Sequence, residues 1–199
     1  VYGSSKVASI NRKHLEMLDF NFNIIEKFEN LKHNKVNLLN IWNDDIDIHF
    51  GKSTINSGEK AFESLKKATE ALKNKQIDVL VTAPINKASI KEKVSGFIGH
   101  TEFLEGNFDG ESLMIMISEK MKIAFLTGHI ALENVKKFVT IDSLIAKTKK
   151  LQNSLIKDFG IRSPKIAILG LNPHAGENGL LGKEEIEFIV PAIKLLKEE

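Results

Sequence analysis

The feature that most constrains the fold is the regular alternation of short apolar runs with amphipathic stretches along the whole chain. Short apolar runs bounded by turn residues are typical of buried strands, whereas apolar residues at helical spacing are typical of helices packed on a sheet. The sequence contains no repeat, heptad seam or low-complexity tract. The alternation therefore predicts an α/β fold with a mostly parallel sheet and helices on both faces.

Six apolar runs are predicted to form strands, at residues 36–41, 46–50, 78–82, 113–118, 123–127 and 165–171. The first, third and sixth are expected to be largely buried, because they carry few polar residues. The turn at residues 119–122 is short enough for a hairpin, so the fourth and fifth strands are expected to pair antiparallel.

Helical spacing of apolar residues predicts helices at residues 57–75, 101–104, 140–159 and 183–197. Thr140 is a candidate N-cap for the third helix, and Gly160 is a suitable stop after it. Pro191 is expected to kink the last helix or to begin a second segment, because proline cannot donate a helical hydrogen bond.

Composition excludes several classes of protein. The 199 residues are 42% hydrophobic, which is sufficient for a real core, and the net charge of +2 gives no basic field for nucleic acid. No cysteine is present, so disulfide scaffolds, cysteine nucleophiles and thiolate metal sites are excluded for this segment. No apolar run reaches the roughly 18 residues of a membrane span, and no signal peptide is visible. We therefore expect no membrane and no nucleic-acid partner.

Polar side chains follow the predicted strand at residues 78–82, where the carboxyl end of a strand in an open α/β sheet commonly meets a ligand. Thr82, Asn86 and Lys87 place a hydroxyl, an amide and an ammonium there. The alternative is a strand-to-helix turn with a solvated lysine. Because Arg12 and Arg162 are the only arginines, a phosphate site in this segment must use lysines, hydroxyls, histidines or backbone N–H groups.

A second polar group is Gly99-His100-Thr101-Glu102, at the start of a predicted helix. The free N–H groups of a helix start favour anions, so His100 and Thr101 are candidates for binding a phosphate or carboxylate. The alternative is that His100 or Thr101 only caps the helix.

Two histidines follow predicted strands: His129 after residues 123–127 and His174 after residues 165–171. If those strands are parallel neighbours, both imidazoles lie at one edge of the sheet and could bind a divalent metal. A catalytic zinc site usually needs about three protein ligands, so the hypothesis requires another ligand from beyond Glu199 or from a partner subunit. The alternative is that both are structural. The remaining histidines, and Glu184 and Glu185 in a first helical turn, are interpreted as structural.

Taken together, these segments resemble the 4-hydroxythreonine-4-phosphate dehydrogenase family of vitamin B6 biosynthesis. The segments that carry the resemblance are Val-Thr-Ala-Pro-Ile-Asn-Lys at 81–87, Gly-His-Thr-Glu-Phe-Leu at 99–104, His129, and Gly-Leu-Asn-Pro-His-Ala-Gly-Glu at 170–177. The resemblance covers essentially the whole chain. Gly128 and Ala131 depart from it, since threonine and proline are common at those positions.

The resemblance implies a three-layer α/β/α fold like that of isocitrate and isopropylmalate dehydrogenases, with a mostly parallel sheet and some antiparallel pairing. It implies that residues 1–199 are one continuous fragment of a two-lobed dehydrogenase, whose N-terminal start and C-terminal part lie outside the segment. It also implies a cytoplasmic homodimer with a metal site shared between subunits.

The resemblance further implies oxidation and decarboxylation of 4-phosphohydroxy-L-threonine to 3-amino-2-oxopropyl phosphate, with NAD and a divalent metal such as zinc, cobalt or magnesium. His100, Thr101 and Lys87 would bind substrate, and His129 and His174 would bind the metal. The NAD-contacting and catalytic residues are not assigned. The alternatives are a paralogue that oxidises a phosphorylated four-carbon sugar acid, and a non-catalytic lobe that binds metal or phosphate.

Overall fold

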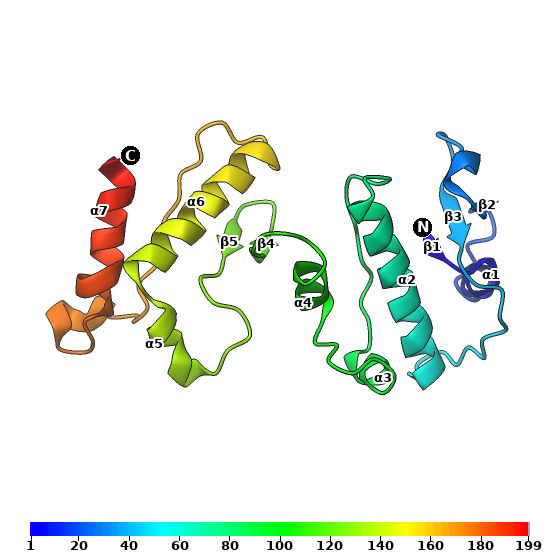
Figure 1. Cartoon of the computed structure of the whole chain (residues 1–199), viewed down its shortest axis with the longest axis horizontal. Helices are drawn as coiled ribbons and strands as arrows, with labels where there is room; N and C mark the ends of the chain where they lie inside the picture. Colours follow the sequence, from blue (N-terminus) through cyan, green and yellow to red (C-terminus); the bar gives the residue numbers. More distant parts are fainter. Residues whose placement is uncertain (199) are drawn as a thin grey trace. The chain divides into compact units, whose positions relative to one another are not determined.

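The computed structural model describes residues 1–198. It divides into two compact units, Val1–Glu111 and the residues from Ser112 onward (Figure 1). Each unit combines strands and helices, so the predicted mixed α/β class is confirmed. No helix in the described part of the chain is both long enough and apolar enough to cross a membrane.

The first unit contains a three-stranded parallel sheet in the order β1-β3-β2. Its central strand corresponds to the run predicted at residues 36–41, and Leu38 on that strand is buried. The elements around the sheet are β1 Tyr2–Gly3, α1 Ser5–His14, β2 Asn23–Ile25, η1 Phe28–Asn30 and β3 Asn37–Asn40.

Three further helices complete the first unit: α2 Ile55–Lys73, α3 Lys87–Lys91 and α4 His100–Glu105. The helices predicted at residues 57–75 and 101–104 are thus confirmed. Thr54 caps α2 by accepting the Ser57 backbone N–H, and Ser57 returns the contact to the Thr54 backbone. Helices α2, α3 and the segment before α4 share one core, formed by Leu65, Ile90 and Phe97.

Helices α2 and α3 approach each other closely at Gly58. A Cβ atom on Gly58 would lie 2.5 Å from the Ser89 carbonyl carbon and 2.6 Å from its oxygen. Such distances are shorter than real Cβ contacts, so only glycine fits there without a shift of α3. This contact fixes the position of α3, whose first residue is Lys87.

The second unit begins with a hairpin of β4 Ile115–Ile117 and β5 Lys122–Ala124. The two strands pair antiparallel, with Met116 opposite Ile123, which confirms the predicted hairpin. The Ser118 backbone N–H closes the turn by donating to the Met121 carbonyl at 2.8 Å.

The other elements described in the second unit are helical: η2 Leu132–Asn134, α5 Val135–Phe138, α6 Ile141–Lys157, η3 Ala175–Gly179, η4 Glu185–Ile189 and α7 Val190–Glu198. Thr140 caps α6 through the Ser143 backbone N–H, and Gly160 after the helix has φ +67°, so both predictions for this helix are confirmed. Val139, Leu144, Ile189 and Ala192 form the core of the unit.

The last helix begins with one wide turn, because η4 is a π-helix that runs directly into α7. The Val190 backbone N–H reaches back to the Glu185 carbonyl, five residues earlier. Pro191, which was predicted to disturb the helix, directly follows Val190. Because proline has no N–H to donate, the regular hydrogen-bond pattern is interrupted at this place.

Three predicted strands are wrong. Residues 46–50 form an irregular segment with Gly51 at φ +77° after it, and His49 Nε2 lies 2.9 Å from Asp47 Oδ2 within it. Residues 78–82 and 165–171 belong to no strand of the two sheets described for residues 1–198. They also are not buried, since Val81 is 89% exposed and Leu169 is 83% exposed. Both keep one face inward, through Leu80 and Ile168, but the described chain supplies no neighbouring strand for their backbone.

Candidate functional site

In the first unit, Lys87 and His100 belong to the two short helices that close the α2 core. Asn86 caps α3 by accepting the Ser89 backbone N–H at 3.1 Å, which places Lys87 on the first turn. A Cβ atom on Gly99 would lie 3.1 Å from Lys87 Nζ and 3.0 Å from a Glu102 carboxylate oxygen. The ends of Lys87 and Glu102 therefore meet at Gly99, directly before His100.

The pKa of His100 is lowered, first because the ring is partly buried and second because the Lys87 ammonium lies close enough to repel a proton. The imidazole is therefore held in its neutral form over a wider pH range than a solvated histidine. A neutral imidazole has one donor nitrogen and one acceptor nitrogen. It can therefore donate a hydrogen bond to a hydroxyl oxygen or accept one from a hydroxyl hydrogen.

Helix α4 has Gly99 as its N-cap, with no side-chain capping bond. His100 and Thr101 both lie inside the helix rather than before it. The alternative that either residue caps this helix is therefore wrong, because the capping position is occupied by a residue without a side chain. Thr101 follows His100 in the same first turn and is partly exposed.

In the second unit, His174 lies on the loop of residues 172–182, which we call the His174 loop. Its backbone has positive φ at successive positions, including Ala175 (+50°), Glu177 (+44°) and Asn178 (+58°). This conformation costs non-glycine residues free energy, of order 1–2 kcal/mol each. Surrounding contacts must hold the loop in place.

The His174 ring faces a carboxylate. Its Nδ1 lies 3.5 Å from Glu177 Oε1, and both side chains are partly exposed. Histidines that ligate a metal through one ring nitrogen commonly present the other to a carboxylate, which fixes the ring orientation. With its Nδ1 turned toward Glu177, the Nε2 of His174 is the nitrogen available to a metal ion.

His129 lies in an exposed loop after β5. The expectation that His129 and His174 share one edge of a parallel sheet is wrong. Within residues 1–198, β5 pairs with β4 in an antiparallel hairpin, and residues 165–171 pair with no strand. Both histidines belong to the second unit. Among residues 1–198, no group of three or more His, Asp or Glu side chains is arranged to hold a metal ion.

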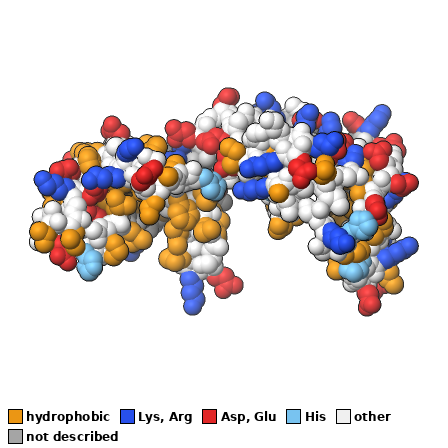
Figure 2. All heavy atoms as spheres, turned by 90° about the horizontal axis from the view of Figure 1, so that it is seen from below, with side chains coloured by type: hydrophobic (Ala, Val, Ile, Leu, Met, Phe, Trp, Pro, Cys, Tyr) orange, Lys and Arg blue, Asp and Glu red, His pale blue; other side chains and the backbone are white. Residues whose placement is uncertain are grey.

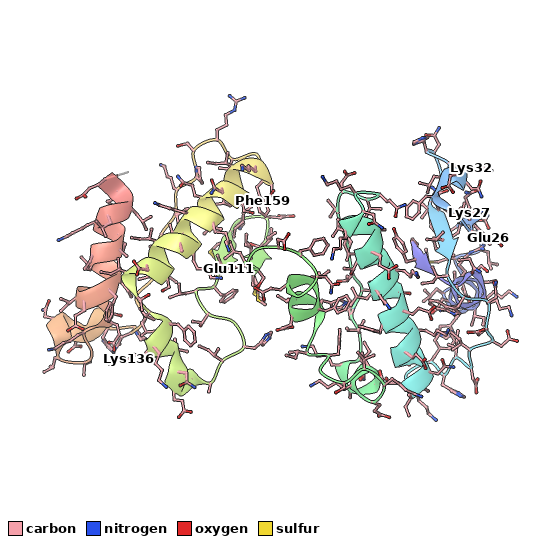
Figure 3. All side chains as sticks on the ribbon, in the orientation of Figure 1. Glu26, Lys27, Lys32, Glu111, Lys136 and Phe159 are labelled. Carbon is pink, nitrogen blue, oxygen red and sulfur yellow. The ribbon has the colours of Figure 1, made fainter. Side chains whose placement is uncertain are left out.

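Glu184 and Glu185 are both buried, although the sequence indicated only an ordinary first helical turn. Lys136 on α5 (Figure 3) pairs with Glu184, with 2.5 Å between Nζ and Oε1. This contact raises the pKa of Lys136 and lowers the pKa of Glu184. Glu185 Oε1 accepts the Asn172 backbone N–H at 2.8 Å, two residues before His174.

Comparison with known proteins gives a match over residues 1–199 to PdxA, described as pyridoxal phosphate biosynthetic protein PdxA. The chain belongs to the PdxA family. It is 39% identical over 202 residues to the 4-hydroxythreonine-4-phosphate dehydrogenase of Bacteroides thetaiotaomicron, covering 100% of this chain and 55% of that protein.

Two other relatives extend the picture of the PdxA family. A Clostridium botulinum protein provisionally named D-threonate 4-phosphate dehydrogenase is 36% identical over 181 residues, which are 89% of this chain and 54% of that protein. The crystal structure of a 4-hydroxythreonine-4-phosphate dehydrogenase from Burkholderia phymatum matches with a TM-score of 0.79 and 27% identity, covering 100% of this chain and 61% of that one. The chain thus spans little more than half the length of these relatives.

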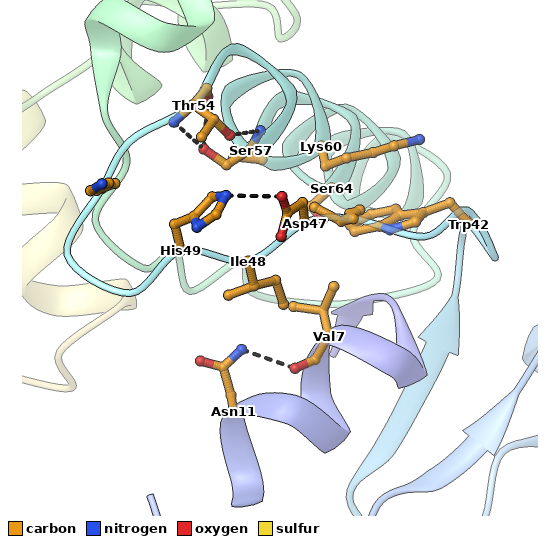
Figure 4. A pocket seen from close by; sticks show the side chains of 13 residues that line it. Val7, Asn11, Trp42, Asp47, Ile48, His49, Thr54, Ser57, Lys60 and Ser64 are labelled. Carbon is orange, nitrogen blue, oxygen red and sulfur yellow. Dashed lines mark hydrogen bonds and ion pairs between the residues drawn. The ribbon is translucent and has the colours of Figure 1, made fainter. Parts of the chain in front are cut away.

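The first unit of this PdxA-family chain also has a cavity of about 290 Å³ between α1, the segment after β3 and the start of α2 (Figure 4). The predicted site residues do not line it. Its polar wall includes His49, whose Nε2 lies 2.9 Å from Asp47, and Lys60, which pairs with Asp44 and lies over the Trp42 ring. Sequence reasoning missed this cavity, because residues 46–50 were expected to form a strand.

Proposed function

We propose that the protein of which this chain is part oxidises and decarboxylates 4-phosphohydroxy-L-threonine to 3-amino-2-oxopropyl phosphate, with NAD and a divalent metal ion, in pyridoxal phosphate biosynthesis. The observation that carries the proposal is the match of the whole chain to the PdxA family, together with a 39% identical relative named for this dehydrogenase. The activity belongs to the whole protein, because the chain spans 55% of that relative.

The substrate-binding part of the proposal rests on Lys87, His100 and Thr101. The Lys87 ammonium is a compact positive charge suited to a phosphate or carboxylate, and it lies close enough to His100 to contribute, after burial, to the lowered pKa of that imidazole. A neutral His100 and the Thr101 hydroxyl can hydrogen-bond a substrate hydroxyl without adding charge. Together they would orient the substrate, and slight misplacement of a reacting group can cost roughly a hundredfold in rate.

His129 and His174 would be the metal-binding residues of this chain. The donors fit a borderline divalent ion such as zinc or cobalt, since both are exposed imidazoles and His174 has a carboxylate at its other nitrogen. When bound, the metal would polarise the substrate oxygens and so favour loss of the hydroxyl proton and, later, of carbon dioxide. A third ligand would come from outside the described residues, in a site shared with a second subunit.

NAD enters the proposal through family membership alone, and no described residue is assigned to it. The glycine-rich His174 loop does not have the spacing of a dinucleotide fingerprint, and residues 165–171 before it pair with no strand in the described part of the chain. We therefore assign this chain substrate and metal contacts and leave its residues that contact the nicotinamide cofactor unassigned.

We propose that the protein is a cytoplasmic homodimer. Hydrophobic side chains gather over the β4–β5 hairpin on the face shown in Figure 2, and Met116 and Ile117 are 60% and 59% exposed on successive positions of β4. Successive residues of a strand point to opposite faces, so both faces of the hairpin carry apolar surface. A two-stranded hairpin is barely stable alone, and a second copy would cover it.

A second candidate substrate is a phosphorylated four-carbon sugar acid. The Clostridium botulinum relative, at 36% identity over 89% of this chain, is named for D-threonate 4-phosphate. That compound has a hydroxyl where 4-phosphohydroxy-L-threonine has an amino group, so the choice depends on the group that faces this position. A non-catalytic lobe that only binds metal or phosphate is the third candidate.

The test is NADH formation by the complete encoded protein with 4-phosphohydroxy-L-threonine, with and without a chelator. His129→Ala and His174→Ala are assayed beside it, with His33→Ala as a control from the first unit. Loss of turnover with chelator and with either site variant supports the proposal. Turnover that survives both would contradict the metal assignment, and turnover with D-threonate 4-phosphate alone would favour the second candidate.

A further inference from the structure

Glu185 lies beneath the His174 loop and is 6% exposed. Its Oε1 accepts the Asn172 backbone N–H at 2.8 Å. Its carboxylate also lies against two glycines: a Cβ atom on Gly170 would be 3.3 Å from Oε1, and one on Gly176 would be 3.1 Å from Oε2. The missing side chains of Gly170 and Gly176 therefore leave the space that the carboxylate occupies.

Asn172 transmits this contact through the rest of the loop. Its side-chain Oδ1 accepts the His174 backbone N–H at 2.9 Å, and its Nδ2 donates to the Leu181 carbonyl at 3.0 Å. One residue thus ties both ends of the loop together, and Glu185 fixes that residue from below. The positive φ values at Ala175, Glu177 and Asn178 lie between these ties.

The start of the helix that carries Glu185 is itself fixed. Glu184 is paired with Lys136 of α5, and Ile189 in the same wide turn is part of the core of the unit. Glu185 Oε2 is buried and has no hydrogen-bond partner among the described residues. A buried carboxylate oxygen without a partner is costly. Its place beneath a loop of strained backbone indicates a role other than general stability.

We propose that Glu185 is a positioning residue that holds the His174 loop in the conformation in which His174 binds a divalent metal ion. The inference rests on the proposed function, since it assigns His174 to the metal. Glu185 itself does not touch the metal. It acts through Asn172, whose backbone and side chain set the position of the His174 main chain.

The experiment uses the complete encoded protein and two readouts, zinc affinity by competition with a chelating dye and hydrogen–deuterium exchange of the peptide that contains Asn172 and His174. Glu185→Ala removes the acceptor, and Glu185→Leu does the same while filling the space, in case the alanine variant does not fold. Glu185→Gln keeps an acceptor oxygen. Glu187→Ala, at an exposed position of the same turn, is the matched control.

We expect the variants without an acceptor to bind zinc about tenfold to a hundredfold more weakly and to exchange the loop amides faster. Glu185→Gln and Glu187→Ala should stay close to the wild type in both readouts. Unchanged zinc affinity and unchanged exchange in Glu185→Ala or Glu185→Leu would overturn the inference. A lower stability with unchanged zinc affinity would also overturn it, because Glu185 would then be merely structural.

Failure of the proposed function gives a different pattern. If His174→Ala binds zinc as tightly as the wild type, His174 is not a metal ligand and the metal assignment fails. If His174→Ala loses zinc while Glu185→Ala does not, the metal assignment stands and only the role of Glu185 is overturned.

Discussion

The Lys87 ammonium nitrogen lies 3.1 Å from the point that a Cβ atom on Gly99 would occupy, and a Glu102 oxygen lies 3.0 Å from the same point. Both neighbours are the ends of flexible side chains, so a methyl group at position 99 can be accommodated if they move. Gly99 has an extended backbone, φ 175°, which any residue can adopt. A substitution here therefore displaces charged groups without straining the chain.

We expect Gly99→Ala to raise KM for the phosphorylated substrate roughly tenfold, which corresponds to about 1.4 kcal/mol of lost binding. The change in unfolding free energy should stay within about 0.5 kcal/mol, because no backbone atom is displaced. Steady-state kinetics and urea unfolding measure the two effects. Gly106→Ala is the control, since its Cβ would make only an ordinary contact at 3.5 Å. An unchanged KM would mean that Lys87 does not contact the substrate.

Lys87→Met should raise the pKa of His100, because one of the two causes of its lowering is the Lys87 charge. The pKa should remain below its ordinary value, since burial is the larger cause and persists. Titration of the His100 imidazole by NMR measures the change, and Lys91→Met, on the same helix, is the control. An unchanged His100 pKa would show that the Lys87 ammonium does not lie near the His100 ring in solution.

The same lowered pKa sets the direction of the pH dependence of stability. Unfolded His100 takes up a proton near its ordinary pKa, about 6.5, whereas folded His100 resists protonation until a lower pH. The contribution of His100 to stability is therefore fully present above its unfolded pKa, and it is lost as pH falls through the folded pKa. His100→Gln should reduce the change of unfolding free energy with pH in this range, as measured by urea unfolding at several pH values. An unchanged pH dependence would show that His100 is not its cause.

Gly58→Ala should destabilise the first unit, although replacing glycine by alanine inside a helix ordinarily stabilises it by about 1 kcal/mol. The new Cβ would meet the backbone of Ser89 at 2.5 Å, and a clash with backbone costs about 1–3 kcal/mol. Because α3 must move, KM should rise as well through Lys87. Asn56→Ala, exposed in the same turn of α2, should show neither effect. A variant more stable than the wild type would contradict the observed packing.

Glu177→Gln should weaken zinc binding about tenfold or more, because the carboxylate that faces His174 Nδ1 is neutralised. The stability of the unit should hardly change, since Glu177 is exposed. Competition with a chelating dye measures the affinity, and Glu133→Gln, exposed in the same unit, is the control. Equal zinc affinity in both variants would show that another group orients the ring.

Local structure was predictable wherever neighbours in sequence determine it. Thr140 and Gly160 bound α6 as their chemistry requires, and residues 119–122 are too few to join anything but a hairpin. Residues 78–82 and 165–171 have the composition of strands, but a strand is completed by hydrogen bonds to another segment, and they pair with no strand among residues 1–198. Composition cannot supply that neighbour.

The candidate site shows the same limit. Lys87, His100 and Thr101 could be proposed from the sequence because each follows a turn marked by proline or glycine. Lys87 and His100 do lie close together. Glu185 could not, because acidic residues are ordinary at the start of a helix. Its burial depends on Gly170 and Gly176, which come before it in the chain and leave room for its carboxylate. Those two glycines were the available signal.

The wide turn at Glu185–Ile189 makes the direction of the Glu185 side chain depend on the number of residues in this turn. Successive residues of a regular α-helix are about 100° apart around the axis. Removing one residue from the turn would leave Ala192 on the core face of α7 but would rotate Glu185 away from Asn172 and toward solvent. A relative with one residue fewer in this turn would keep the apolar pattern of the helix. Its glutamate would no longer support the histidine loop. If Glu185 supports the His174 loop as proposed, insertions and deletions in this turn should weaken metal binding as changes of His174 would.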